Sequence, residues 1–362
     1  MQEIINSKQW TDWRWQLANT IRSVDKLVRY VSISAERAKE LQLTANNEYQ
    51  NGRDEMRLTP YLVSLMNLAD ENDPIALQHL PRREEMQPDD FSFDEVWEKP
   101  EDFLDGGNRL VQQKYPDVAV LRLSNACHSF CRFCFEKERT LRHGVPTNAG
   151  PEQFTAAVEM ICKNTRIRTV LVSGGDPLIV PDEILADRLR ALSAIPHLKT
   201  IRVNTRALLH NPFRVTTELA ALLGNIQAES WKKRAKGIQI RIGVHFNHPR
   251  ELTSEAMSAI RTLQRAGIET YNQTVLLKKI NNNFKTIQKL FRLLREEGVE
   301  LHYLSHAMTV PRTSHFRTSV EKGQQIMRAL RQCKEFRGQL PYFELSHHTG
   351  KQMIPDTMNE QF

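Results

Sequence analysis

Three cysteines lie within eight residues of the sequence, at Cys127, Cys131 and Cys134. Thiolates crowded in this way bind soft metals, chiefly zinc or the iron of iron–sulfur clusters. Structural zinc takes four ligands, often from two separated pairs, and here only His128 or His143 stands nearby to complete a set. Three cysteines can instead hold three irons of a four-iron cluster, which leaves the fourth iron open to an outside ligand. Together with the loops described below, the spacing favours an iron–sulfur cluster over structural zinc.

Strand-like and helix-like segments alternate from about residue 117 onward. Buried-strand patterns recur at 118–123, 169–172, 201–203, 238–244, 270–276 and 299–304, with a further strand-like piece at 340–345. Helical spacing of apolar residues predicts helices at 154–161, 184–192, 218–223, 254–265, 287–294 and 320–331. This alternation predicts an α/β fold, with a parallel sheet and helices outside it. Six repeats suit a barrel or partial barrel, and a doubly wound open sheet is the alternative.

Polar residues follow the carboxyl ends of these strands, which is where both architectures bind ligands. The cysteines follow the first strand, and Gly-Gly-Asp-Pro at 174–177 follows the second. Arg206 follows the third strand, His245 follows the fourth, and Gln273 lies on the fifth. Chance would place polar residues at the opposite ends as well, and it would not supply a cysteine triplet. We therefore expect these residues to gather on one face around a ligand.

The first 110 residues differ from the repeating part of the chain. A tryptophan-rich stretch at 10–16 opens helix-like periodicity that continues to about residue 42. The tripeptide Thr-Pro-Tyr at 59–61 opens another short helix, because proline suits a first turn. Residues 71–108 are acidic, contain prolines and have few apolar runs, which predicts an irregular connector. We therefore expect residues 1–110 to form a helical region and a connector.

Composition limits the classes of function. The 362 residues include 50 Lys and Arg against 43 Asp and Glu, a formal charge of +7, and 40% are hydrophobic, which is ordinary for a globular protein. No apolar run reaches the ~18 residues that a membrane helix needs, and the first residues lack a signal-peptide pattern. Five cysteines without a secretion signal favour a reducing compartment, so we expect a cytoplasmic protein without a membrane partner.

Two smaller features have ordinary structural interpretations. Cys162 and Cys333 lie in helix-like stretches, and we interpret them as core thiols. The basic stretch 231–236 is predicted to be a solvated loop before a strand rather than a nucleic-acid site, because no nucleic-acid-binding motif accompanies it. Nucleic acid is therefore not an expected partner.

The cysteine spacing and the glycine-rich loop together resemble the radical S-adenosylmethionine superfamily. The resemblance narrows to the lysine 2,3-aminomutase family through short segments spread along the chain. These segments are WRWQ at 13–16, TPY at 59–61, KYPD at 114–117, HFNHP at 245–249, NQTVLL at 272–277, HFRT at 315–318 and TGK at 349–351. The resemblance covers residues from about 10 to 356 and implies a partial (β/α)6 barrel with an N-terminal helical extension.

This resemblance implies an aminomutase, an isomerase that moves an amino group between adjacent carbons in a 2,3-shift. The implied cofactors are a [4Fe–4S] cluster, S-adenosylmethionine and pyridoxal 5′-phosphate. A cluster reduced by an electron donor such as flavodoxin or ferredoxin would split S-adenosylmethionine into methionine and a 5′-deoxyadenosyl radical. That radical would take a hydrogen from the substrate while pyridoxal phosphate holds the migrating amine.

Positions that match the family's motifs imply roles for individual residues. The implied cluster ligands are Cys127, Cys131 and Cys134. The residues implied around S-adenosylmethionine are Gly174, Gly175, Asp176, Arg206, His245 and Gln273. The barrel core at 111–336 would carry both sets, and Lys351 in the C-terminal segment 337–362 would bind pyridoxal phosphate. Lys114 stands in place of one phosphate-binding arginine and Val118 in place of a second, so Arg122 is a candidate to compensate.

The implied substrate pocket departs from the family's pattern. Glu136 stands where the family has an arginine that pairs with the substrate carboxylate, and a carboxylate there would repel that group unless Lys137 or Arg139 takes over. Of the two family aspartates that bind the lysine side chain, one aligns with Met308 and the other with Glu344. We therefore expect the substrate to be an amino acid or related amine other than plain L-lysine.

Two other functions stay open on this evidence. Without a clamp for a carboxylate, the enzyme could act on a protein-bound lysine of a translation factor, as relatives in the family do. A metal-stabilised binding module without catalysis is a different class, which metal analysis would separate. The sequence stops at Phe362 before the family's C-terminal zinc-binding cysteines, so no zinc bridge between subunits is expected, while a homo-oligomer stays open.

Overall fold

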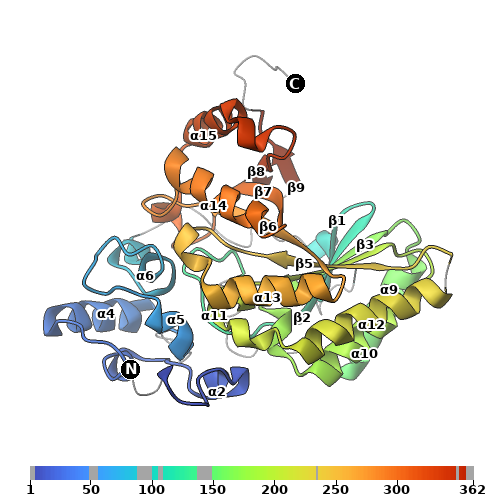
Figure 1. Ribbon diagram of the computed structural model, residues 1–362, viewed down its shortest axis with the longest axis horizontal. Helices are drawn as coiled ribbons and strands as arrows, with labels where there is room; N and C mark the ends of the chain where they lie inside the picture. The colour runs from blue at the N-terminus through green and yellow to red at the C-terminus, as the bar shows by residue number, and fades with distance from the viewer. Residues whose placement is uncertain are drawn as a thin grey trace.

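The strands of the chain form one sheet in which they lie side by side in sequence order (Figure 1). The computed structural model describes residues 5–48, 56–87, 100–104, 109–136, 149–233, 235–347 and 350–355. The strands within these residues are β1 (Val111–Tyr115), β2 (Val118–Ser124), β3 (Thr169–Gly174), β4 (Thr200–Thr205), β5 (Gln239–Val244), β6 (Glu269–Leu276), β7 (Glu300–His306), β8 (Tyr342–His347) and β9 (Gly350–Met353). Strands β2 to β8 are parallel, whereas β1 and β9 pair antiparallel at the two edges.

The strand order identifies a partial barrel. In a doubly wound sheet the order reverses at a switch point, whereas here the order runs from β1 to β9 without a reversal. Among the described residues no backbone ladder joins β1 to β9, so the ring stays open at one seam. The expected α/β class and partial (β/α)6 barrel are therefore confirmed, and the doubly wound alternative is excluded.

Helices cover the outside of the barrel, and a long helix follows each of the strands β2 to β7 (Figure 1). These helices are α9 (Pro151–Lys163), α10 (Asp182–Ser193), α12 (Thr217–Lys233), α13 (Ser254–Arg265), α14 (Phe284–Glu296) and α15 (Val320–Gln332), with the short α11 (Ala207–His210) ahead of α12. The intervening 3₁₀ turns are η4 (Pro177–Ile179), η5 (Pro212–Arg214), η6 (Pro249–Glu251), η7 (Ser314–Phe316) and η8 (Lys334–Phe336). Each helix predicted in this part of the chain is present, and the one expected at 218–223 is the first part of the longer α12.

Helix α14 shows why these segments become helices. Its residues Ile287, Leu290, Phe291 and Leu294 are all buried, and their spacing places them on one face against the sheet. The side chain of Asn283 accepts a hydrogen bond from the Thr286 N–H at 2.9 Å and so caps the first turn. The buried face is the one predicted from the apolar spacing.

Alternation along the strands separates the core from the barrel interior. On β4, Ile201 and Val203 are fully buried in the hydrophobic core beneath the helices. Arg202 and Asn204 alternate with them, and successive side chains of a strand point to opposite faces, so these two face the inside of the barrel. The barrel interior is therefore lined with polar and charged groups, which must be paired to be buried.

Short helices of the N-terminal region pack to one side of the barrel (blue in Figure 1). They are α2 (Trp13–Ala18), α3 (Val24–Leu27), α4 (Ala35–Glu48), α5 (Pro60–Ser64), α6 (Ala76–His79) and the 3₁₀ turns η1 (Arg83–Met86) and η2 (Pro100–Asp102). The hydroxyl of Thr59 caps α5 by accepting from the Leu62 N–H at 3.2 Å, and it donates to the carbonyl of His210 at the end of α11. This contact ties the predicted short helix to the barrel.

Residues 71–87 form a packed part of the structure, so the prediction of an irregular connector is wrong for this stretch. Asp73, Gln78, His79 and Glu85 are each at most 1% exposed. These buried side chains are polar and are satisfied by hydrogen bonds to the barrel, so a search for apolar runs does not detect them. Residues 88–99 and 105–108 of the same predicted connector lie outside the described residues.

Two smaller predictions also need correction. Cys162 is exposed on α9, because it follows the buried Ile161 and points away from the core, and Cys333 is only partly buried. Trp231, Lys232 and Lys233 belong to the end of α12 rather than to a loop, although both lysines are exposed as expected. In the part of the chain that the structure describes, no helix is both long enough and apolar enough to span a membrane.

Candidate active site

The three cysteines lie on the loop that follows β2, where the sequence predicts a metal cluster. All are unpaired thiols, and burial raises the pKa of each of them. The neighbouring sulfur of Cys134 raises the pKa of Cys127 further, and burial together with Cys131 raises the pKa of Cys134 to about 12. Such thiols resist ionisation on their own, and a bound metal removes the conflict by replacing their protons. The donor set therefore fits a soft metal cluster.

Arg206 places a positive charge against one of these sulfurs. Its Nη1 donates to Cys131 Sγ at 2.9 Å, and its Nη2 donates to Gln78 Oε1 at 2.7 Å and to Glu251 Oε1 at 3.2 Å. The guanidinium lies 5.0 Å over the ring of Phe133. Burial opposes its charge, but Cys131 and Glu251 raise the pKa of Arg206 above the ordinary value. Arg206 is therefore a fixed cation at the cysteine loop.

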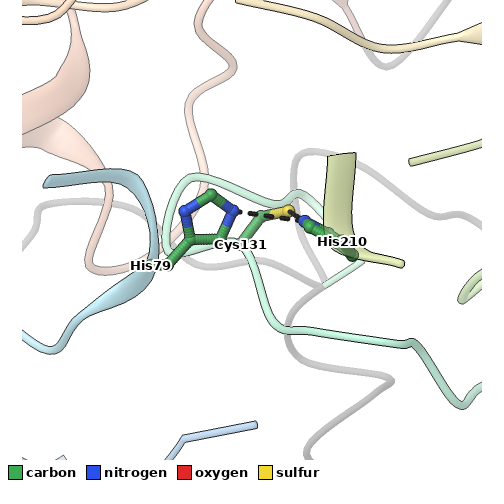
Figure 2. Close-up of side chains that lie close together, drawn as sticks. All are labelled: His79, Cys131 and His210. Carbon is green, nitrogen blue, oxygen red and sulfur yellow. Dashed lines mark hydrogen bonds between the residues drawn. The ribbon is translucent and has the colours of Figure 1, made fainter. Parts of the chain in front are cut away.

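Two buried histidines that the sequence did not single out also lie beside Cys131 (Figure 2). His210 Nε2 is 3.8 Å from Cys131 Sγ and 3.2 Å from His79 Nε2. Burial, and then the charge of Arg206, lower the pKa of both imidazoles well below the ordinary value, so both are neutral. No sequence signal pointed to them, since His79 lies in the stretch read as a connector and His210 ends a helix of four residues.

Two glycines bring the loop after β3 against the cysteine loop. A Cβ on Gly174 would collide with the carbonyl oxygen of Ser124, and one on Gly175 would collide with that of Ala126. Gly174 also has a φ of +111°, which L side chains rarely adopt. The N–H of Asp176 then donates to the Ala126 carbonyl at 2.8 Å. The two glycines are required for this close packing of the loops.

Asp176 holds a buried negative charge between the loops after β3 and β4. Its carboxylate accepts hydrogen bonds from the Thr205 hydroxyl at 2.7 and 2.9 Å, from the Arg206 N–H at 2.9 Å and from the Leu178 N–H at 3.0 Å. Burial favours its neutral form, but contacts with His128 and Thr205 bring the pKa of Asp176 below the ordinary value. Asp176 is therefore an ionised group that positions the backbone of Arg206.

His245, after β5, presents an unsatisfied nitrogen. Its ring packs edge-on against Phe133 with the centroids 5.8 Å apart. Burial, and then Arg206, lower the pKa of His245 to about 3, so the ring is neutral. Among the described residues its buried Nε2 has no hydrogen-bond partner, which fits a site where a polar ligand binds. Gln273 lies on β6 between the buried residues Asn272 and Thr274.

Lys351 lies on β9 at the open seam of the barrel. Its Nζ is 3.3 Å from Glu344 Oε1 on β8 and 3.6 Å above the ring of Tyr303 on β7. The backbone N–H of Lys351 donates to the hydroxyl of Tyr115 on β1. The neighbouring Gly350 allows this close approach, because a Cβ on it would lie only 2.7 Å from the same hydroxyl oxygen. Burial lowers the pKa of Lys351, whereas Glu344 acts in the opposite direction. This lysine loses its proton more readily than an exposed lysine does.

Glu136 and Arg122 form a buried ion pair inside the barrel. Glu136 Oε1 accepts from Arg122 Nε at 3.3 Å and from Nη2 at 3.1 Å, and that Nη2 also donates to Gln112 Oε1 at 2.8 Å. Both side chains are less than 10% exposed. The negative charge that the sequence places at Glu136 is therefore neutralised by the arginine that was a candidate for a phosphate site. Lys137 and Arg139, the candidates to bind the substrate carboxylate in place of Glu136, lie outside the described residues.

Comparison with known proteins decides the family. The model for the radical SAM superfamily matches residues 121–294. The chain is 33% identical, over 90% of its length, to the L-lysine 2,3-aminomutase of Fusobacterium nucleatum, and it covers 72% of that protein. The chain belongs to the lysine 2,3-aminomutase family. Over 90% of its length it is also 30% identical to the glutamate 2,3-aminomutase of Clostridioides difficile, of which it covers 71%.

Lysine 2,3-aminomutases are radical SAM isomerases, and they use a [4Fe–4S] cluster, S-adenosylmethionine and pyridoxal phosphate. The class of enzyme and the cofactors implied by the sequence resemblance are therefore confirmed for this family. Among solved structures, the Streptococcus suis SuiB structure bound to S-adenosylmethionine aligns with a TM-score of 0.46 at 16% identity, covering 64% of this chain and 51% of that one.

The remaining predicted residues of this aminomutase have ordinary surroundings. Lys114 on β1 lies 3.5 Å from Asp102, and both side chains are largely buried. Met308 follows β7 and is partly buried, and its carbonyl accepts from the Thr313 hydroxyl at 3.4 Å. Among the predicted substrate residues the structure thus pairs Glu136 and Glu344 with cations, whereas Met308 offers no charged group.

Proposed function

We propose that this aminomutase is pyridoxal-phosphate-dependent and that Lys351 is the residue that binds this cofactor. The observation that carries the proposal is the position of Lys351, a lysine at the open seam of the barrel whose Nζ lies 3.3 Å from a buried carboxylate. Burial lowers the pKa of Lys351, and a neutral amine is the form that attacks the carbonyl of an aldehyde. Glu344 beside it can take up the proton that the ammonium releases.

The other residues would divide the remaining tasks. Cys127, Cys131 and Cys134 would ligate the cluster, whose fourth iron stays open for S-adenosylmethionine. When bound, the cofactors supply a carbon radical and a place to hold an amino group in transit. His245 would offer its unsatisfied Nε2 to S-adenosylmethionine, together with the glycine loop at 174–176 and with Arg206 and Gln273. The walls of the barrel would exclude water from the radical.

The charges of the pocket support a substrate other than plain L-lysine. Arg122 and Glu136 neutralise each other. The positive charge of Arg122 is therefore already paired and is not available for a substrate carboxylate. Met308 takes the place of one acidic group, and Glu344 is paired with Lys351. We propose a free amino acid or related amine whose charges are placed differently from those of lysine. The glutamate 2,3-aminomutase relative supports the view that the family accepts such changes.

A screen of substrates under anaerobic conditions tests this function. Reduced holoenzyme would be incubated with candidate amino acids, with amines and with a cell lysate, and 5′-deoxyadenosine and product mass would be measured. Turnover with a free amino acid or amine, giving an isomer of unchanged mass, is the expected result. Turnover only with a protein fraction would instead establish the alternative, a lysine on a translation factor.

The lysine assignment has its own test. The wild-type protein with pyridoxal phosphate should show an imine absorbance band that is absent in Lys351→Ala. Lys278→Ala, at a position that no site described above includes, is the matched control and should retain the band. An unchanged band and unchanged activity in Lys351→Ala would refute the role of Lys351.

We also propose the division of the chain and its setting in the cell. Residues 111–336 would hold the cluster and S-adenosylmethionine, 337–362 would carry the pyridoxal-phosphate lysine, and 1–110 would form a helical region and connector. All five cysteines are unpaired thiols, which supports a reducing, cytoplasmic location. A low-potential donor such as flavodoxin or ferredoxin would reduce the cluster, and assembly into a homo-oligomer would be tested by light scattering.

A further inference from the structure

Two histidines from distant parts of the chain converge on one cysteine of the cluster loop (Figure 2). His79 ends α6 in the N-terminal region, and His210 ends α11 after β4. Their Nε2 atoms and Cys131 Sγ all lie within 4.8 Å of one another. Both histidines are at most 1% exposed, so water does not compete for their hydrogen bonds.

The hydrogen bonds of His79 fix where its proton lies. Its Nδ1 is 2.7 Å from the carbonyl oxygen of Ile75, which can only accept, so Nδ1 carries the hydrogen. Its Nε2 is 3.2 Å from Arg206 Nη1, which can only donate, so Nε2 is the acceptor. His79 is therefore a neutral ring whose Nε2 accepts from Arg206 and lies equally close, at 3.2 Å, to His210 Nε2.

The proton of His210 follows from that of His79. Because His79 Nε2 is an acceptor, the 3.2 Å contact between the two Nε2 atoms requires a hydrogen on His210 Nε2. Its Nδ1 is buried without a partner among the described residues, and a hydrogen there would be an orphaned donor. His210 Nε2 also lies 3.8 Å from Cys131 Sγ, so its single N–H is shared between His79 Nε2 and the sulfur, which accepts from Arg206 as well.

The trio of His79, Cys131 and His210 is better explained as the surroundings of a cluster sulfur than as a separate metal site. The guanidinium of Arg206 lies 2.9 Å from Cys131 Sγ and 3.2 Å from His79 Nε2. A divalent cation bound by the same atoms would be forced against this positive charge, which is unfavourable at such distances.

We propose that His210 donates a hydrogen bond to the cluster sulfur of Cys131 and thereby raises the reduction potential of the cluster, with His79 as the residue that positions it. A donor to a cluster sulfur stabilises the reduced form, which carries more negative charge. His210 and His79 are positioning residues in this proposal, since neither touches the reacting atoms. The proposal depends on the family's cluster and not on the role of Lys351.

An EPR-monitored redox titration of the reconstituted holoenzyme, without substrate, tests this directly. His210→Phe should shift the midpoint potential of the cluster to a more negative value by about 59 mV. For one electron, this shift is about a tenfold change in the ratio of oxidised to reduced cluster at a given potential. His210→Gln should restore most of the wild-type potential, because its amide can place an N–H near the position of Nε2. His79→Phe should lower the potential by a smaller amount.

His197→Phe is the matched control, because His197 contacts the carbonyl of Ile161, far along the chain from the cysteines. The cluster of this variant should have the same midpoint potential as the wild-type cluster. Equal potentials in wild type and His210→Phe at equal iron content would overturn the proposal.

A second measurement uses wild-type protein with ¹⁵N-labelled histidine. Pulsed EPR of the reduced cluster should detect a coupled imidazole nitrogen, and the absence of that coupling would also overturn the proposal.

Discussion

The charge state of Lys351 decides whether this residue can act as a nucleophile. The neutral fraction of a lysine rises with pH through its pKa, and burial lowers the pKa of Lys351 from the ordinary ~10.4. We expect the imine band formed with pyridoxal phosphate to appear with a midpoint pH below that of an exposed lysine. The measurement is the absorbance of the band from pH 7 to 10.

The carboxylate of Glu344 favours the ammonium form of Lys351, so Glu344→Gln should move this midpoint to lower pH still. Glu296→Gln, an exposed position on α14, should leave the midpoint unchanged. A shift to higher pH in Glu344→Gln would contradict the electrostatic role assigned to Glu344.

The buried pair of Arg122 and Glu136 gives a prediction about stability. Arg122→Leu leaves the Glu136 carboxylate buried without its main cation and should reduce the free energy of unfolding by about 3–5 kcal/mol. The double variant Arg122→Leu/Glu136→Leu removes both charges and should recover much of that loss. Urea unfolding of the four proteins in the double-mutant cycle measures the coupling. Additive effects would show that the two charges do not depend on each other.

Single residues could be predicted where their spacing in the sequence carries the chemistry. Cys127, Cys131 and Cys134 were singled out by their spacing, and the structure places these free thiols on one loop, while their role as cluster ligands stays a prediction. His79 and His210 could not be found, because they meet across 131 positions and neither belongs to a motif. The ion pair between Glu136 and Arg122 could not be predicted from the sequence either, because it depends on which side chains meet in the barrel interior.

The loop after β3 depends on the absence of side chains at its glycines. Gly174→Ala combines a strained φ of +111° with a collision against the Ser124 carbonyl. Gly267→Ala is a matched control, because Gly267 has a φ of +76° but nothing within 4 Å of the added Cβ. Strain alone should cost about 1–2 kcal/mol in Gly267→Ala.

The cost in Gly174→Ala should be larger, and the iron content of the purified variant should fall because the cysteine loop must move. Urea unfolding and iron analysis measure these two effects. Equal stability and equal iron content in both variants would show that the close contact between the two loops is unimportant.

Whole elements were predicted best where one face is apolar and the other polar. The buried residues Ile287, Leu290, Phe291 and Leu294 of α14 are the ones chosen from the sequence. The alternation of strands and helices predicted a parallel sheet but left a doubly wound order open, and only the family resemblance implied the barrel order that the structure has. The prediction for segment 71–87 failed because its few buried apolar residues, such as Ile75 and Leu80, are interleaved with buried polar side chains whose hydrogen-bond partners lie in distant elements.

The N-terminal region and the barrel are joined through Gln78. Its Oε1 accepts from Arg206 at 2.7 Å and from Asn247 at 2.9 Å, and its Nε2 donates to Glu251 at 2.6 Å. Gln78→Leu removes these three hydrogen bonds and leaves the buried Asn247 amide without this acceptor, at about 1–3 kcal/mol, while Arg206 and Glu251 keep the contact with each other. We expect a lower free energy of unfolding in urea, with Gln87→Leu, at an exposed position of the same region, as the unaffected control. Equal stability of the two variants would show that the hydrogen bonds of Gln78 do not contribute to the packing of the N-terminal region on the barrel.

The seam between β1 and β9 has a mechanical consequence for the complete molecule. In a closed barrel, widening the wall means breaking a row of peptide hydrogen bonds. Here, among the described residues, no such row joins β1 to β9, and the Tyr115 hydroxyl accepts a hydrogen bond from the backbone of Lys351 across the gap. Separating the two edges therefore breaks fewer peptide hydrogen bonds than opening a closed barrel would, and we expect a planar cofactor to enter the barrel at this seam.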